Sequence, residues 1–182
     1  MNLLNFSLKP FRERDPVPDM EITGSIGRSA TVLTVRYELR GDLSTLAIPA
    51  RVEVPGRKDR LWEDTCPELF LAVSGSGAYW EFNLSPAGHW NVYRFGSYRE
   101  GMREEPGFTS LPFEVRTEPG ALRLCLDLDI GKIIPADKAA DVAVCAVVKT
   151  TTDVISHWAL AHPGPRPDFH RRDGFALTVP GE

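Results

Sequence analysis

The sequence predicts an all-β protein folded as a single antiparallel β-sandwich over residues 1–182. Short segments rich in Val, Leu, Ile and aromatic residues recur between Gly, Pro and Asp breaks, which is the pattern of sandwiches and barrels. The 15 prolines interrupt most windows in which a helix would otherwise fit. A chain of 182 residues has the length of one domain, so we expect one hydrophobic core.

The predicted strands are segments in which apolar side chains alternate or cluster between turn residues. In chain order they are 20–27, 30–39, 67–74, 77–84, 90–96, 113–118, 121–128, 141–149, 154–161 and 174–179. The best helical window is 130–140, where Pro135 leaves room for only a turn or two. Helices are therefore not expected to form a layer of the fold.

Several junctions between these strands carry the residues of tight turns. Glycine supplies a positive φ angle and proline presets the bend of the chain. The junctions are Gly27-Arg28-Ser29, Gly75-Ser76-Gly77, Pro86-Ala87-Gly88 and Pro119-Gly120. Such short connections indicate that neighbouring strands run antiparallel.

Two later strands are expected to supply core. Leucine occupies every second position of 121–128, and valine or alanine occupies every second position of 141–149. Because strand side chains alternate between two faces, each row lies on one face. Burial of each large side chain contributes about 1.5 to 3 kcal/mol, so we assign both rows to the inner face of a sheet.

Composition limits the class of partner. The apolar fraction of 42% and the charged fraction of 25% are those of a soluble globular domain. The net charge of −4 comes without a basic stripe, which argues against nucleic acid and anionic membranes as partners. No apolar run approaches the roughly 20 residues of a membrane span, and residues 1–10 lack the features of a signal peptide, so we expect a cytoplasmic location.

The three cysteines, Cys66, Cys125 and Cys145, are expected to be reduced. Their count is odd and their spacing is wide, which suits neither a disulfide framework nor a zinc site. A buried free thiol behaves as a small hydrophobic side chain. We therefore assign the cysteines a packing role.

The most informative stretch is 62–99, where polar and aromatic groups share one face of a predicted hairpin. In 67–74, Glu68 points to the opposite side from the neighbouring leucines, and in 77–84, Glu81 and Asn83 oppose Trp80. One face is therefore apolar, and the other carries carboxylates, an amide and aromatic rings. We interpret this polar face as a candidate ligand platform.

A sugar ring has apolar C–H faces and a belt of hydroxyl groups, so its site needs flat rings and converging polar side chains. The candidate ligand-binding residues that supply this mixture are Trp62, Glu68, Glu81, Asn83, Arg94 and Trp158. The alternative is that the tryptophans are core residues and the charged side chains form a solvated cross-strand ladder. Trp80 fits that alternative, because it shares a face with Phe82 and Leu84.

A family resemblance rests on the same stretch. The run Trp62-Glu63-Asp64-Thr65-Cys66-Pro67-Glu68-Leu69-Phe70 is followed by Tyr79-Trp80-Glu81-Phe82-Asn83-Leu84-Ser85-Pro86 and by Trp90-x-x-Tyr93. This pattern resembles the DOMON-like superfamily and is most similar to the family 9 carbohydrate-binding modules. The resemblance covers about residues 20–180 in layout and is motif-specific only in 62–99.

The resemblance implies a sandwich of immunoglobulin-like or jelly-roll type that binds a sugar or, in some relatives, haem. In the sugar-binding relatives two tryptophans clamp the sugar ring, and Trp62 and Trp158 match those positions. Glu68 matches a carboxylate that hydrogen-bonds sugar hydroxyls, whereas Glu81, Asn83 and Arg94 match less securely. We therefore expect Trp62 and Trp158 to face each other across a cleft.

No cofactor is predicted, although calcium and haem stay open as alternatives. Asp15, Asp19 and Glu21, or Asp127 and Asp129, offer oxygen ligands without the ordered spacing of a calcium loop.

The long C-terminal loop 156–175 contains His157, His162 and His170, whose spacings match no common metal motif. Neither Met20 nor Met102 lies in a recognisable haem context. Long ordered loops often carry function, so this loop is itself of interest.

The sequence thus favours a non-catalytic module for a small polar ligand, and we expect that ligand to be a saccharide. The rival is a small glycosidase or isomerase that uses Glu68 and Glu81 as a carboxylate pair. The sequence shows no nucleophile elbow or phosphate loop, which argues against catalysis. A protein-docking module and a haem-carrying domain are the remaining alternatives, and the oligomeric state is not predicted.

Overall fold

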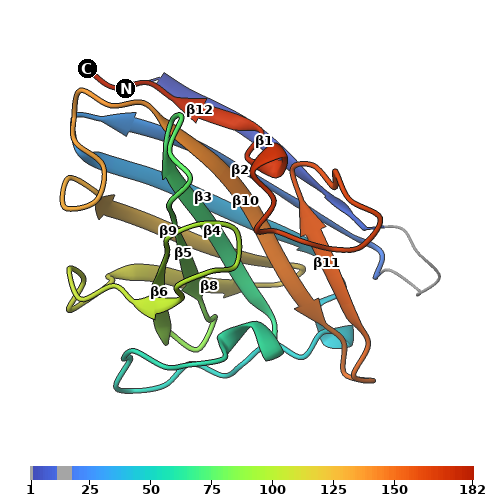
Figure 1. The fold of residues 1–182 in the computed structure, drawn as a ribbon. Coiled ribbons are helices and arrows are strands. Elements are labelled where there is room, and N and C mark those ends of the chain that lie inside the picture. The colour runs from blue at the N-terminus through green and yellow to red at the C-terminus, as the bar shows by residue number, and fades with distance from the viewer. Residues whose placement is uncertain (1, 12–17) are drawn as a thin grey trace.

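A computed structural model describes residues 2–11 and 18–182, and these residues form an all-β fold (Figure 1). The strands are β1 (Asn2–Pro10), β2 (Met20–Ser29), β3 (Val32–Gly41), β4 (Cys66–Val73), β5 (Tyr79–Leu84), β6 (Trp90–Phe95), β7 (Arg103–Glu104), β8 (Phe113–Glu118), β9 (Ala121–Asp129), β10 (Ala140–Lys149), β11 (Ile155–Ala159) and β12 (Leu177–Val179). Three single-turn 3₁₀ helices join them: η1 (Leu43–Thr45), η2 (Leu61–Glu63) and η3 (Arg172–Gly174).

The strands make one antiparallel sheet that curls into two layers. Sheet A has the order β1-β2-β3-β9-β8, and sheet B has the order β7-β6-β5-β4-β10-β11. Strand β1 belongs to both, because its first part pairs with β2 while Lys9 and Pro10 pair with β11. Strand β12 continues the edge of β10 beyond β11. The predicted antiparallel β-sandwich is confirmed.

The main core fills the space between the two sheets. Sheet A contributes alternating residues of β3 and β9, including Val35 and Leu126. Sheet B contributes Leu69 of β4, Phe82 of β5 and Val144 of β10. The alternation that the sequence shows in 121–128 and 141–149 therefore does place one row of each strand in the core.

Most predicted strands are observed with ends shifted by one to three residues. The differences have local causes: β2 continues through Ser29 and turns at Ala30, whose φ is +50°, and the last strand begins late because η3 precedes it. Residues 130–139 form turns without a helix, and Ala140 begins β10. Strand β1 was not predicted, although Leu4, Phe6 and Leu8 alternate there, and neither was the two-residue β7.

The predicted turns at Gly75, Gly88 and Gly120 are all present. Each of these glycines has a positive φ angle, between +73° and +99°. A side chain at such an angle is strained, so glycine closes each hairpin without steric strain. Among the described residues, no helix has the length and apolarity needed to cross a membrane.

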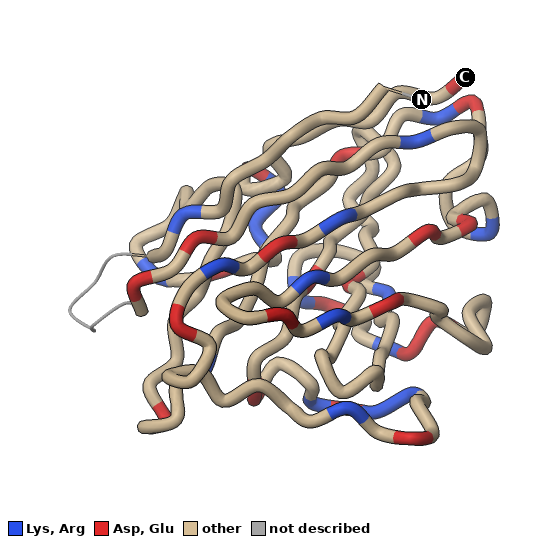
Figure 2. Tube along the Cα trace, turned by 180° about the vertical axis from the view of Figure 1, so that it is seen from behind, with Lys and Arg blue, Asp and Glu red and all other residues tan. Residues whose placement is uncertain are grey.

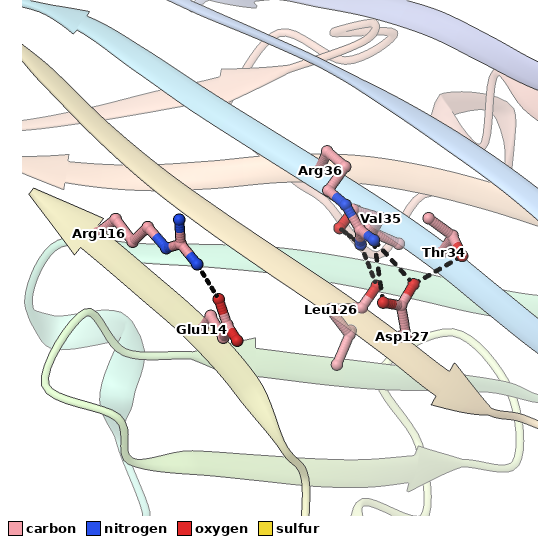
Figure 3. A network of polar contacts seen from close by, with 7 residues as sticks. All are labelled: Thr34, Val35, Arg36, Glu114, Arg116, Leu126 and Asp127. Carbon is pink, nitrogen blue, oxygen red and sulfur yellow. Dashed lines mark hydrogen bonds and ion pairs between the residues drawn. The ribbon is translucent and has the colours of Figure 1, made fainter.

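The outer face of sheet A is a solvated ladder of ion pairs. Figure 2 shows Lys and Arg interspersed with Asp and Glu along the strands on that side of the molecule. In the part enlarged in Figure 3, Arg36 donates to both carboxylate oxygens of Asp127 at 2.9 and 3.1 Å, and Arg116 pairs with Glu114 at 2.9 Å. Exposed pairs of this kind contribute little to stability, because both charges are solvated.

Candidate functional site

The outer face of sheet B is different, because it carries a second apolar cluster and an open pocket of about 360 Å³. That volume lies in the lower part of the usual range for small-molecule sites, about 300 to 1,000 Å³. The polar residues that line the pocket are Glu68, Glu81, Arg99, His157, Asp168 and His170. The apolar lining residues are Trp62, Phe95, Met102, Val147, Pro167 and Phe169.

Strand register places the two glutamates beside each other. Glu68 on β4 lies opposite Asn83 on β5, so Glu81, two residues before Asn83, is its diagonal neighbour on the same face. Leu69 and Phe82 point the other way into the main core. The hairpin therefore presents its carboxyl groups outward for the same reason that it buries its leucines inward, namely the two-residue period of a strand.

Both carboxyl groups are buried, which makes their charged forms costly. Glu68 is 2% exposed, and burial followed by the nearby charge of Glu81 raises its pKa well above the ordinary value. Burial also raises the pKa of Glu81 to about 7, although a hydrogen bond from Asn83 and the charge of Arg99 act in the opposite direction. The pair is consequently poised to hold a proton near neutral pH.

Asn83 supports Glu81 and does not line the pocket. Its side chain is fully buried, and its amide donates to Glu81 Oε1 at 2.8 Å. The prediction that Asn83 lies on the polar face is correct, but the structure places it beneath the surface as a positioning residue. Glu68 Oε1 has no hydrogen-bond partner among the described residues.

Trp62 lies at the rim of the pocket, on the turn η2 that leads into β4. Its half-buried indole packs edge-on against Tyr93, with ring centroids 5.8 Å apart. The Tyr93 hydroxyl donates to Asp59 and accepts a 2.8 Å hydrogen bond from Asn91. This network fixes the ring beneath Trp62 and leaves part of the indole facing the pocket.

The C-terminal loop covers the other side of the pocket, and in Figure 1 it lies in front of β10 and β11. Asp168 anchors it: its carboxylate accepts from the Tyr98 hydroxyl, from Arg99 Nη2 at 2.9 Å and from the backbone N–H of His170 at 3.1 Å. Tyr98 and Arg99 belong to the β6–β7 connection. Two distant loops therefore meet at one carboxylate.

The imidazole groups of the pocket are neutral near pH 7. Burial lowers the pKa of His170 to about 4, and burial also lowers the pKa of His157. His170 Nδ1 shares a 2.9 Å hydrogen bond with the Tyr79 hydroxyl, and its Nε2 lies 3.9 Å from Glu81 Oε2. Tyr79 itself stacks on Phe95 at a centroid distance of 4.8 Å. This stacking supports the side of the pocket that is lined by Phe95 and His170.

The expected clamp of Trp62 and Trp158 is wrong in its geometry. Trp158 is 3% exposed, lies in the main core and donates from Nε1 to Ser156 Oγ at 3.0 Å. It is paired with Ala146 of β10, another core residue, whereas its neighbour His157 points to the pocket. Alternation along β11 thus puts the imidazole, and not the indole, on the outer face.

Arg94 is also on the other side of sheet B. It is paired with Trp80 of β5, and its guanidinium lies 5.7 Å from the centre of the Trp80 ring. It faces a separate open depression with Arg57 and Arg103. The structure therefore brings Trp62, Glu68 and Glu81 together and leaves Arg94 and Trp158 apart from them. Trp80 and Trp90 are core residues, as the alternative interpretation held for Trp80.

Several pocket residues were not predicted as ligand contacts, chiefly Arg99, Asp168 and His170. The C-terminal loop had been singled out for its length and its histidines, and it does line the pocket. Within 62–99, the Tyr98-Arg99 pair follows β6 directly, but nothing in the local sequence connects it to a residue 69 positions later. The contact between Arg99 and Asp168 arises only when the folded chain brings the two loops together.

The described residues contain no group of three His, Cys, Asp or Glu side chains placed to hold a metal ion. Asp127 is bound by Arg36, and Asp129 accepts from the N–H of Gly131 at 2.9 Å. Asp15, named as a calcium candidate, lies outside the described residues.

Met102 and two histidines do meet in the pocket, and these are residue types that ligate haem iron. His170 does not fit that role, because both of its ring nitrogens face oxygen atoms of Tyr79 and Glu81. The buried carboxyl pair on the floor is likewise unsuited to an apolar macrocycle. We derive no chemistry through haem.

Comparison with known proteins shows similarity of fold. No family model and no curated protein matches the sequence. Among solved structures, a candidate carbohydrate-binding protein from Bacteroides uniformis is 18% identical, with a TM-score of 0.72 over 99% of this chain and 87% of that one.

Two structures of a family 9 carbohydrate-binding module from Caldicellulosiruptor kristjanssonii are also similar. The complex with glucose is 10% identical, with a TM-score of 0.54 over 92% of this chain and 79% of that one. The complex with cellotriose is 11% identical, with a TM-score of 0.58 over 96% and 83%. Identities this low establish a shared architecture and nothing finer.

Proposed function

We propose that this domain binds a saccharide without changing it chemically, in the pocket on the outer face of sheet B. The observation that carries the proposal is the meeting of a half-buried indole, Trp62, with two buried carboxyl groups, Glu68 and Glu81, around one cavity. The indole offers a flat surface to the C–H face of a sugar ring. The carboxyl groups offer acceptors to its hydroxyls.

The similarities of fold support the same conclusion. The Bacteroides uniformis protein is described as a candidate carbohydrate-binding protein, and the Caldicellulosiruptor kristjanssonii module is seen with glucose and cellotriose. In this chain Trp62 shares the pocket lining with two rings of the C-terminal loop, those of Phe169 and His170.

Calorimetric titration with glucose and cellobiose tests the proposal. The wild-type protein should bind at least one of them, Trp62→Ala should weaken binding at least tenfold, and Trp62→Phe should retain part of the affinity because a ring remains. A tenfold loss corresponds to about 1.4 kcal/mol. Arg94→Ala is the control, because Arg94 lies on the opposite side of sheet B and should leave the affinity unchanged.

A second candidate function, acid–base catalysis on a sugar, is favoured by one observation. Burial raises the pKa of Glu81 to about 7, which is suited to proton transfer at neutral pH. Glu81→Gln separates the two functions: a binding site loses affinity only, whereas a catalyst loses turnover. Assays of glycoside hydrolysis and sugar isomerisation by the wild-type protein should show none if the first proposal is correct.

A further inference from the structure

The pocket has more carboxyl groups than permanently cationic groups. Its lining contains the carboxyl groups of Glu68, Glu81 and Asp168 but a single guanidinium, that of Arg99. Arg99 is bound to Asp168 at 2.9 Å. The two lining imidazoles do not compensate, since burial lowers the pKa of each. Among the described residues, no lysine or arginine forms an ion pair with Glu68 or Glu81.

Glu68 is the least satisfied of these groups. Its side chain lines the pocket, is 2% exposed, and its Oε1 has no hydrogen-bond partner among the described residues. Asn83, directly opposite on β5, donates its amide to Glu81 instead. A buried acceptor without a donor is costly, and the deficit is larger when the acceptor is a carboxylate. A ligand that brings donors to this atom relieves that cost.

The walls beside the carboxyl pair are aromatic. Trp62, Phe95 and Phe169 line the same cavity. The faces of aromatic rings attract cations, tryptophan most strongly. Buried carboxyl groups in a cavity lined by aromatic rings are a combination that recognises an ammonium group better than a neutral hydroxyl.

We propose that the pocket selects saccharides that carry a protonated amino group, and that Glu68 receives the ammonium with Glu81 beside it. This inference rests on the proposed function and narrows it to one class of sugar. An ammonium group supplies three donors and a positive charge, so its binding favours the ionised form of the pair, displaces the proton that burial retains there and satisfies Glu68. A hydroxyl supplies one donor and no charge, and an N-acetyl group likewise supplies no charge.

Calorimetric titration at pH 7 and low salt tests the inference with four probes: glucosamine, 6-amino-6-deoxyglucose, N-acetylglucosamine and glucose. At least one of the free amines should bind tenfold or more tightly than both glucose and N-acetylglucosamine. If glucose binds as tightly as both amines, the inference is overturned while the saccharide proposal stands. If the wild-type protein binds none of these four sugars and also does not bind cellobiose, the saccharide proposal itself fails.

Variants locate the selectivity. Glu68→Gln keeps the shape of the side chain but removes its charge, so it should reduce the preference for the amine at least fivefold. The matched control is Glu114→Gln, an exposed glutamate paired with Arg116 on sheet A, which should leave the preference unchanged. Glu81→Gln provides a second variant if Glu68→Gln does not fold. Retention of the full preference in folded Glu68→Gln, or in Glu81→Gln where only that variant folds, overturns the assignment.

Discussion

The carboxylate of Asp168 lies 2.9 Å from the guanidinium of Arg99, and this pair joins two loops that are 69 residues apart in the sequence. One loop connects β6 to β7, and the other leads from β11 to the C-terminal strand. Both loops line the pocket. The pair therefore sets how the C-terminal loop is held over sheet B, and with it the shape of the candidate site.

Removing the Asp168 carboxylate should loosen the C-terminal loop. Asp168→Ala deletes the acceptor for Tyr98, Arg99 and the N–H of His170, and we expect a loss of about 1 to 3 kcal/mol in the free energy of unfolding. Amide hydrogen exchange in 162–171 should accelerate. Asp173→Ala is the control, because Asp173 is an exposed partner of Arg171 in the same segment. Equal exchange in the two variants would contradict the anchoring role.

Stability should fall as pH rises above about 6.5. Burial raises the pKa of Glu81 from 4.5 to about 7. Between these two pH values the folded protein therefore binds more protons than the unfolded chain, and its stability falls as pH rises. The total loss from this group is about 3 kcal/mol. The lowered pKa of His170, from 6.5 to about 4, acts in the opposite sense at lower pH, where stability rises as the unfolded chain loses its proton. The two contributions therefore largely offset each other below pH 6.5.

Urea unfolding at pH 6.5 and pH 8 measures this effect. Glu81 should account for about 1 kcal/mol of the loss between these two values, and Glu68, whose pKa is raised further, adds to it. Glu81→Gln and Glu68→Gln should each show a smaller loss than the wild type. Identical losses in all three proteins would mean that the carboxyl groups are not held protonated.

Trp158 should matter for stability and not for ligand contact. Trp158→Ala removes a large side chain from the main core, and we expect a cost of about 3 to 5 kcal/mol. Trp158→Phe should cost less and should bind saccharide with wild-type affinity. Loss of binding by Trp158→Phe at an unchanged melting temperature would mean that the Trp158 indole contacts the ligand.

The cysteines should differ in reactivity. Burial raises the pKa of Cys66 and of Cys145 well above the ordinary value, whereas Cys125 is only half-buried. A thiol reagent should therefore label one cysteine in the native protein and all three in denaturant. Cys125→Ser should abolish the native labelling. Rapid native labelling of Cys66 or Cys145 would show that the outer face of sheet B opens.

The sequence was a good guide to the fold wherever side chains alternate. Glu68 and Glu81 were correctly placed on one face, because the period of two fixes their side relative to the leucines. Alternation does not say which face of a strand meets the core, and here Trp158 and Arg94 were misplaced. Trp158 is opposite Ala146, and that register depends on the whole sheet.

Contacts between distant loops lie outside what a local pattern predicts. The bond between Arg99 and Asp168 depends on how the chain closes over sheet B, as does the hydrogen bond of Tyr79 with His170. Strand β1 is a different case: its alternating Leu4, Phe6 and Leu8 were available in the sequence. It could have been predicted by the same rule that identified the other strands.

The four indole N–H signals in a two-dimensional ¹H–¹⁵N NMR spectrum provide the most direct test of the central claim, since the chain has four tryptophans. Trp80, Trp90 and Trp158 lie in the main core, and Trp62 alone among the tryptophans lines the pocket. During titration with a bound saccharide, the Trp62 signal should shift most and the three core signals should stay nearly still. A saccharide that binds but leaves Trp62 unmoved, or that shifts Trp158 instead, would contradict the account.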